Sequence, residues 1–275
     1  MNDLSIPPRP QIMLELTQLM KDDDLELTRL AALIKQDVAL YSALLAAVNS
    51  PWMGLPESVD CIENAVTIMG MSKVVSLIQA MTVRTTFKNV PLLESFWESA
   101  AEVASISDFL AKRYRLPNAD QAYTSGMLHN AGVAIMIQSL PEYKTFFDTH
   151  GKQPTHELCA LERQHFSTDH FFQGAMLTKK WFMPGEVALS IRYQPIAHSV
   201  LTGKKTLPTS VADLLAILVL AKSISQEYQN YWKVEKSDLE QRTLLAALDY
   251  LEIHEVEFNE LREDLLESMS NSAVA

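Results

Sequence analysis

Apolar residues recur along this chain with the spacing of a helix, and no run of residues alternates as a strand does. Leu40, Leu44 and Val48 share one helical face, in a helix that Asp37 can cap. The 275-residue chain has only 8 Gly and 12 Pro and no Asn-Gly or Asp-Gly pair, which is too little turn chemistry for a barrel or a sandwich. The pattern therefore predicts an all-α fold.

Short capping motifs predict where several helices begin and end. The pattern S-x-x-E, formed by Ser95 and Glu98, places one helix start. Ser237 and Glu240 repeat it near the C-terminus, and Gly70 is expected to end an earlier helix. Further starts are predicted at Pro141, Thr155, Asp169 and Pro184. We expect about a dozen short helices joined by short loops.

The overall charge argues against nucleic acid as a partner. The formal net charge is −11 and the pI is about 5.1, and the sequence contains no basic run that could hold a phosphate backbone. Hydrophobic residues make up 48% and charged residues 21%, a balance typical of globular proteins. These values leave a core-rich globular chain and name no function.

The cysteines and the apolar segments indicate a cytoplasmic protein. Cys61 and Cys159 are too few for a disulfide framework or a four-cysteine zinc site. The longest apolar segment, residues 211–221, is about half the length of a membrane span and contains Asp213, so it predicts a buried helix. The N-terminus carries neither a basic start nor an apolar stretch, so we expect no leader and no membrane partner.

The acidic charge is concentrated near the C-terminus. Residues 235–267 contain eleven acidic and three basic residues, which is −8 of the total −11, and the remaining chain carries only −3. Apolar residues between Leu244 and Leu266 predict an amphipathic helix pair. Its acidic side is either a solvated face or a docking surface for a basic protein partner. The oligomeric state stays open.

Common catalytic motifs are missing from the sequence: there is no H-E-x-x-H, phosphate-binding loop, G-x-G-x-x-G or G-x-S-x-G. Three segments, residues 44–54, 125–132 and 161–184, stand in an order and spacing that resembles the HDOD family. The match extends from about Ile6 to about Pro195. Its motif residues include Asn49, Ser50, Gly54, Glu162, Arg163, Gly174, Trp181 and Pro184.

The resemblance implies a domain organisation. An HDOD domain would cover residues 1–200, with an N-terminal helical lobe over about 1–90 and an HD-like core over about 91–200. Residues 201–275 would form C-terminal helices packed on that core as a helical hairpin. The family is a bacterial, all-helical relative of the HD phosphohydrolases, in which His and Asp residues on neighbouring helices hold a divalent metal that activates water.

The resemblance also implies that the metal site is degenerate. The early His of the HD pattern falls at Ser99, and the His-Asp pair falls at His129 and Asn130. The tandem His falls at Gln194, and the last Asp falls at Lys222, where it places a positive charge. If the alignment at Lys222 is shifted, Asp213 is the only nearby carboxylate candidate. Only His129 retains a good ligand, whereas a catalytic metal needs three or more. We therefore expect no catalytic residues, no metal and no cofactor.

A small polar pocket is expected where the metal site would have been. Its candidate lining is Glu98, Ser99, Glu102, His129, Asn130, Asp169, His170, Gln194 and Lys222. If a divalent metal binds after all, its ligands would be His129, Asp169 and His170. The competing interpretations are that His129 is a hydrogen-bonded core residue, that Asp169 caps a helix, and that Glu162 and Arg163 form a solvated pair.

Three functions remain from the sequence. The favoured one is a non-catalytic signalling or regulatory module that binds a protein partner, in part through its acidic C-terminal helices. The alternatives are a metal-dependent phosphohydrolase acting on a nucleotide or cyclic dinucleotide, and a small-molecule sensor that uses the vestigial pocket. The partner, the pathway and the input signal are not encoded in any motif.

Overall fold

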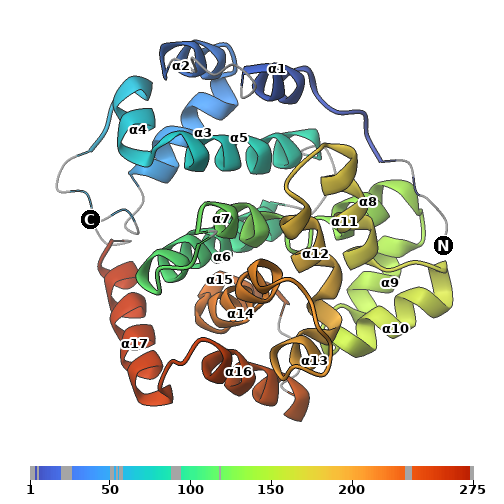
Figure 1. Cartoon of the computed structure of the whole chain (residues 1–275). Coiled ribbons are helices and arrows are strands. Elements are labelled where there is room, and N and C mark those ends of the chain that lie inside the picture. The colour runs from blue at the N-terminus through green and yellow to red at the C-terminus, as the bar shows by residue number, and fades with distance from the viewer. Residues whose placement is uncertain are drawn as a thin grey trace.

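The computed structural model describes residue 4 and residues 6–19, 27–49, 53, 55, 58–87, 94–117, 119–232 and 237–272. Every regular element within these residues is a helix, which confirms the predicted all-α class (Figure 1). Along the same stretches no single helix is long and apolar enough to cross a membrane. Two pairs of consecutive helices, each bent at a short break, reach the length and apolar composition of a membrane span only when the two helices are taken together.

The N-terminal helices form the upper layer in Figure 1. They are α1 (Gln11–Leu19), α2 (Leu27–Lys35), α3 (Val38–Val48), α4 (Ile62–Met69) and α5 (Met71–Thr86). The predicted apolar face of α3 is confirmed, because Leu40, Leu44 and Val48 are buried and the Asp37 carboxylate accepts the Leu40 N–H at 3.1 Å. Gly70, with φ of 78°, separates α4 from α5 as expected.

The middle of the chain builds the centre and the right side of the molecule (Figure 1). Its elements are α6 (Glu94–Arg113), α7 (Ala119–Leu128), α8 (Gly132–Ser139), α9 (Tyr143–His150), α10 (Thr155–Phe166), α11 (His170–Lys180), α12 (Gly185–Tyr193) and the 3₁₀ turn η2 (Gln194–Ile196). Helices α6 and α7 lie unusually close at Gly126, where a Cβ would stand 2.6 Å from the Cα of Ala104. This close contact places α7 at the centre of the core.

The C-terminal helices cover the lower side of that core. They are α13 (Ala197–Leu201), α14 (Thr209–Ile224), α15 (Gln226–Trp232), α16 (Asp238–Tyr250) and α17 (Glu255–Ser272). Helix α14 is buried along nearly its whole length, as expected, and the Tyr250 hydroxyl donates to Asp213 at 3.0 Å. The predicted capping box of Ser237 and Glu240 forms at the start of α16.

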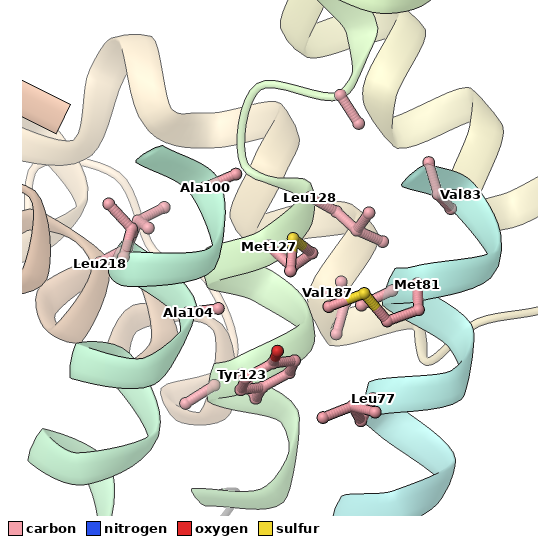
Figure 2. Close-up of a cluster of buried hydrophobic side chains, with 14 of the residues drawn as sticks. Leu77, Met81, Val83, Ala100, Ala104, Tyr123, Met127, Leu128, Val187 and Leu218 are labelled. Carbon is pink, nitrogen blue, oxygen red and sulfur yellow. The ribbon is translucent and has the colours of Figure 1, made fainter. Parts of the chain in front are cut away.

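Helix α7 packs between α5 and α6, and the three share one apolar cluster. Figure 2 shows Leu77 and Met81 of α5 beside Tyr123 and Met127 of α7, with Val187 of α12 close by. The same hydrophobic core continues from the N-terminal helices to α17. The C-terminal helices therefore share the core of the rest of the chain, and the boundaries expected near residues 90 and 200 stay predictions.

Some of the predicted helix starts agree with the structure, and one does not. Asp169 caps α11 and Pro184 precedes α12, as expected. The start predicted at Ser95 is wrong, because α6 already includes Glu94. Phe96 and Trp97, which follow directly, are buried, and Phe96 packs against Trp232 of α15. Ser95 thus lies inside α6 rather than before it, a difference of the size by which the assigned ends of helices vary.

Candidate functional site

His129 lies in the turn between α7 and α8, at the centre of the expected pocket, and is buried. Its Nδ1 donates to the carbonyl of Gly126 at 2.6 Å, so the neutral ring presents a lone pair at Nε2. Nε2 itself is buried and has no hydrogen-bond partner. Burial and then the charge of Lys222 lower the pKa of His129 to about 3, so the ring is uncharged at neutral pH.

Three elements from the C-terminal half converge on His129. The ring of Tyr228, on α15, lies 5.6 Å from the His129 ring, and Lys222 Nζ, on α14, lies 5.0 Å from the Tyr228 ring. Lys222 also donates to Gln194 Oε1 at 3.4 Å, and Gln194 Nε2 donates to the His129 carbonyl at 2.6 Å. The structure thus brings His129, Gln194 and Lys222 together.

The remaining residues expected around this pocket are placed differently. Glu98 is exposed on α6, while the Ser99 hydroxyl is buried and donates to the carbonyl of Phe96 at 2.9 Å. Glu102 is buried and accepts a hydrogen bond from Ser225, at the end of α14. Asn130 is buried beside His129, and its Oδ1 has no hydrogen-bond partner. Glu98 is therefore separated from the buried members of the set.

Glu162 is the centre of a second buried polar cluster. Its carboxylate accepts hydrogen bonds from His170 Nδ1, 2.8 Å from both oxygens, from the His170 N–H at 3.1 Å, and from the Tyr143 hydroxyl. Burial and the neighbouring Glu162 raise the pKa of Tyr143 well above its usual value. Glu162 is fully buried, so the interpretation of a solvated pair with Arg163 is wrong for this residue. Its partners come from α9 and α11, which a motif within α10 cannot show.

Asp169 joins α10 to α11. One carboxylate oxygen accepts the Phe172 N–H at 2.8 Å and caps α11, and the other accepts Arg163 Nε at 2.7 Å. Burial by itself would raise the pKa of Asp169, but these hydrogen bonds and the nearby charge of Arg192 outweigh it and hold the pKa below its ordinary value. Both oxygens are committed to α10 and α11.

The side chains present do not fit the divalent metal of an HD site. His170 Nδ1 is turned to Glu162, Asp169 is paired with Arg163, and the ammonium group of Lys222 stands beside His129. Throughout the part of the chain that the structure describes, no three His, Cys, Asp or Glu side chains gather in a group that could hold a metal ion. A cation close to the remaining ligand also repels a metal ion.

Two of the motif residues within the described ranges, Asn49 and Trp181, make hydrogen bonds to backbone groups of distant segments. The Asn49 side-chain amide makes two hydrogen bonds of 2.7 Å to the Val59 backbone. Its Nδ2 donates to the Val59 carbonyl, and its Oδ1 accepts the Val59 N–H. Trp181 is buried, and its Nε1 donates to the Pro7 carbonyl at 3.2 Å. Ser50 and Gly54 lie outside the described residues.

Glycines from two motif segments allow α8 and α11 to touch. A Cβ on Gly132 would stand 1.7 Å from the His170 carbonyl oxygen. On the facing helix, a Cβ on Gly174 would stand 3.3 Å from the Gly132 nitrogen. This contact positions the turn that carries His129 against the helix that carries His170.

The sequence did not predict two residues of the His129 and Glu162 clusters. Tyr143 stands on α9, outside the matched segments, and Tyr228 stands in the loosely matched C-terminal part. No local pattern marks either tyrosine. The only available signal for the second cluster was the recurrence of an acid-base pair, Glu162-Arg163 and then Asp169-His170, seven residues apart.

Comparison with known proteins identifies the family of this chain. A family model for the HDOD domain matches residues 6–196. An uncharacterized protein of Treponema pallidum (strain Nichols) is 28% identical over an alignment of 197 residues, and the match covers 68% of this chain. The match covers only 37% of that relative's length.

Solved structures share the fold over nearly the whole chain. A protein named putative phosphohydrolase from Shewanella amazonensis SB2B is 23% identical, with a TM-score of 0.70 over 95% of this chain and 90% of its own. An HDOD domain protein from Geobacter sulfurreducens is 21% identical, with a TM-score of 0.67 over 98% and 92%. A putative signal transduction protein from Marinobacter aquaeolei VT8 is 19% identical, with a TM-score of 0.68 over 98% of this chain and 59% of its own.

Proposed function

The chain belongs to the HDOD domain family, and from that premise we propose that it is a non-catalytic signalling or regulatory module that binds a protein partner in the cytoplasm. Of the solved structures with this fold, one is named a putative phosphohydrolase and another a putative signal transduction protein. The observation that carries the proposal is the position of Lys222, which contacts the same tyrosine ring as His129.

Lys222 acts against metal chemistry for an electrostatic reason. Two like unit charges about 4 Å apart repel each other by about 4 kcal/mol near a protein surface, and a divalent ion doubles the charge on one side. Asn130 offers a neutral amide where the HD pattern has a carboxylate, so it does not offset this repulsion. Gln194 and Tyr228 instead hold the ammonium group in place.

The partner would dock on the acidic side of the C-terminal helices. The acidic face consists of the exposed α17 residues Glu255, Glu257, Glu260, Glu263, Asp264 and Glu267. Arg262 is the only basic residue of this helix, so the field is strongly negative. Such a face raises the association rate of a protein that presents a positively charged surface, and it disfavours nucleic acid and anionic membranes.

The non-catalytic assignment is tested by turnover. Purified protein is supplied with Mg²⁺, Mn²⁺, Fe²⁺ or Zn²⁺ and a panel of nucleotides and cyclic dinucleotides, beside His129→Ala as a control. We expect no hydrolysis by either protein. Hydrolysis by the wild type that His129→Ala abolishes would overturn the proposal in favour of a phosphohydrolase, which is the alternative with least support from the site.

The docking role of the acidic face is tested by charge reversal. Glu260→Lys with Glu263→Lys should reduce the recovery of a cross-linked partner, while Glu157→Lys, on the exposed side of α10, should leave recovery unchanged. Both variants should unfold at the wild-type temperature, since surface substitutions change stability little. Equal recovery by all three proteins would reduce the acidic face to a solubility feature.

A small-molecule sensor is the second candidate, and two unpaired atoms favour it. His129 Nε2 and Asn130 Oδ1 are buried hydrogen-bond acceptors without partners, and such atoms carry a free-energy cost that a donor group on a ligand would relieve. Thermal-shift measurements with the nucleotide panel test this candidate. A ligand that raises the melting temperature of the wild type, but not of His129→Ala, would establish it.

A further inference from the structure

A small positively charged surface with an exposed aromatic ring lies at the turn between α11 and α12. This basic–aromatic face consists of Arg9, Lys179, Lys180 and Phe182. Phe182 is 76% exposed, the highest value among the large apolar side chains that the structure describes. Residues 170–185 contain no acidic side chain, although the whole chain carries −11.

The backbone at Phe182 shows that this ring is held outward at a cost. Phe182 has a φ of 56°, a conformation that favours glycine, and it closes a Schellman turn in which its N–H donates to Lys179 O and the Met183 N–H to Thr178 O. The other described non-glycine residues with positive φ, Arg115, Ser167 and Glu252, are all polar. A bulky apolar residue is therefore kept where glycine would fit better and would expose less apolar surface.

The N-terminal segment completes the face. Lys180 Nζ donates to the Ile6 carbonyl at 2.7 Å and Trp181 Nε1 to the Pro7 carbonyl at 3.2 Å, which fixes this segment across the turn. Arg9 then stacks over the Phe182 ring, with its Cζ 5.0 Å from the ring centroid. Residues from the two ends of the matched domain thus form one surface, which no local stretch of sequence shows.

The acidic face has the complementary composition. Val256 is 70% exposed and stands between Glu255 and Glu257 in the first turn of α17, and Glu260 follows one helical turn later. In Figure 1, α17 lies on the left of the molecule, while α11 and α12 lie on the right of the centre. The α17 helix of one chain therefore cannot cover Phe182 of the same chain.

We propose that the acidic face of one copy docks on the basic–aromatic face of a second copy, with Val256 and Phe182 as the apolar contact. The proposal rests on the proposed function in using the acidic face for docking, and it names the partner as the chain itself. Because the two surfaces differ, the contact is head-to-tail and leaves one free face at each end, so it builds rings or open chains rather than an isolated pair.

The contact depends on protein concentration and salt. In sedimentation velocity at low ionic strength, the weight-average mass of the wild type should rise with concentration. It should return to the monomer mass in high salt, because exposed charges are screened there. A wild type that remains monomeric at its highest attainable concentration in low salt overturns the proposal.

A charge exchange tests which surfaces meet. Arg9→Glu with Lys179→Glu reverses the basic–aromatic face and leaves the Lys180 contact with Ile6 intact. Glu260→Lys with Glu263→Lys lowers the net charge of the acidic face, counted with Arg262, from −5 to −1. The first variant alone carries two negative faces, and the second has lost most of the negative charge of its acidic face, so each should be monomeric. In an equal mixture, the intact acidic face of the first variant meets the intact basic–aromatic face of the second, so the mixture should associate. A mixture that associates no better than its components overturns the proposal.

Phe182→Gly separates docking from folding. Glycine suits a φ of 56°, so the variant should melt at or above the wild-type temperature. Loss of the exposed ring should nevertheless weaken self-association at least about tenfold, as truncation of a central aromatic contact does. Wild-type association by Phe182→Gly would overturn the role of the ring.

The outcomes also separate this inference from the proposed function. A monomeric wild type whose capture of a different protein is lost in Glu260→Lys with Glu263→Lys overturns self-association and leaves the signalling role intact. Metal-dependent hydrolysis together with restored association in the charge exchange overturns the proposed non-catalytic role and leaves self-association intact.

Discussion

Lys222 and His129 contact the same aromatic ring, with Lys222 Nζ 5.0 Å from the ring of Tyr228 and the His129 ring 5.6 Å from it. A positive charge thus stands beside the residue that would be the surviving ligand of an HD site. Burial and then this positive charge lower the pKa of His129, and the contribution of Lys222 can be measured directly.

Lys222→Met should raise the pKa of His129. The substitution removes the second largest cause of the lowered pKa while keeping an aliphatic side chain of similar length, but burial remains, so the pKa should rise from about 3 without reaching its usual value. NMR titration of the His129 ring measures the change. Lys179→Met, on the exposed side of α11, is the control that should leave the titration unchanged. An identical pKa in Lys222→Met would show that the ammonium group does not act on His129.

His129 should make the protein less stable in mild acid. Its folded-state pKa is depressed, so the unfolded state binds a proton that the folded state does not. The stability it contributes is full above the unfolded pKa of 6.5 and is lost progressively as the pH falls from there toward about 3. Urea unfolding across this interval should show a shallower decline for His129→Gln than for the wild type, and parallel declines would contradict the assignment.

Glu162→Gln should destabilise the fold strongly. The carboxylate accepts hydrogen bonds from Tyr143 and from two groups of His170, and an amide cannot accept them all. Breaking such a buried set costs about 3–5 kcal/mol. Urea unfolding measures the loss, and Glu157→Gln on the exposed side of the same helix should change stability by less than about 0.5 kcal/mol. If Glu162→Gln lost as little free energy of unfolding as Glu157→Gln, the Glu162 cluster would be shown to be dispensable for stability.

Gly132→Ala should separate α8 from α11. The new methyl group would stand 1.7 Å from the His170 carbonyl oxygen, so one helix must move, at a cost of about 3 kcal/mol. Gly185→Ala is the matched control, because nothing lies within 4 Å of its Cβ position and its φ is not positive. Thermal unfolding compares the two. Similar melting temperatures would mean that the helices are less tightly packed than described.

The elements that the sequence predicted well are those set by neighbouring residues. The apolar face of α3, the capping box at Ser237 and the cap at Asp169 depend on side chains within a few positions of one another, so local spacing is sufficient to place them. Ser95 shows the limit of this reasoning, because a local motif places a helix end only to within one or two residues.

The candidate site was predicted only in part. The neutral and cationic residues at the expected ligand positions, Asn130 and Lys222, can be read directly because they are matters of residue type. The burial of Glu162 and the exposure of Glu98 cannot be predicted in this way. Both are glutamates on helices, and only the packing of a neighbouring helix decides which of them is buried.

The sequence by itself determined an all-helical chain with an HDOD pattern, because helical period and residue type are local properties. Only the tertiary structure decided that Lys222 meets Tyr228 and that Arg9 meets Phe182. Contacts of this kind join segments distant in sequence, and they form because burying the shared core selects one arrangement of the helices. The surface chemistry of the protein follows from that arrangement.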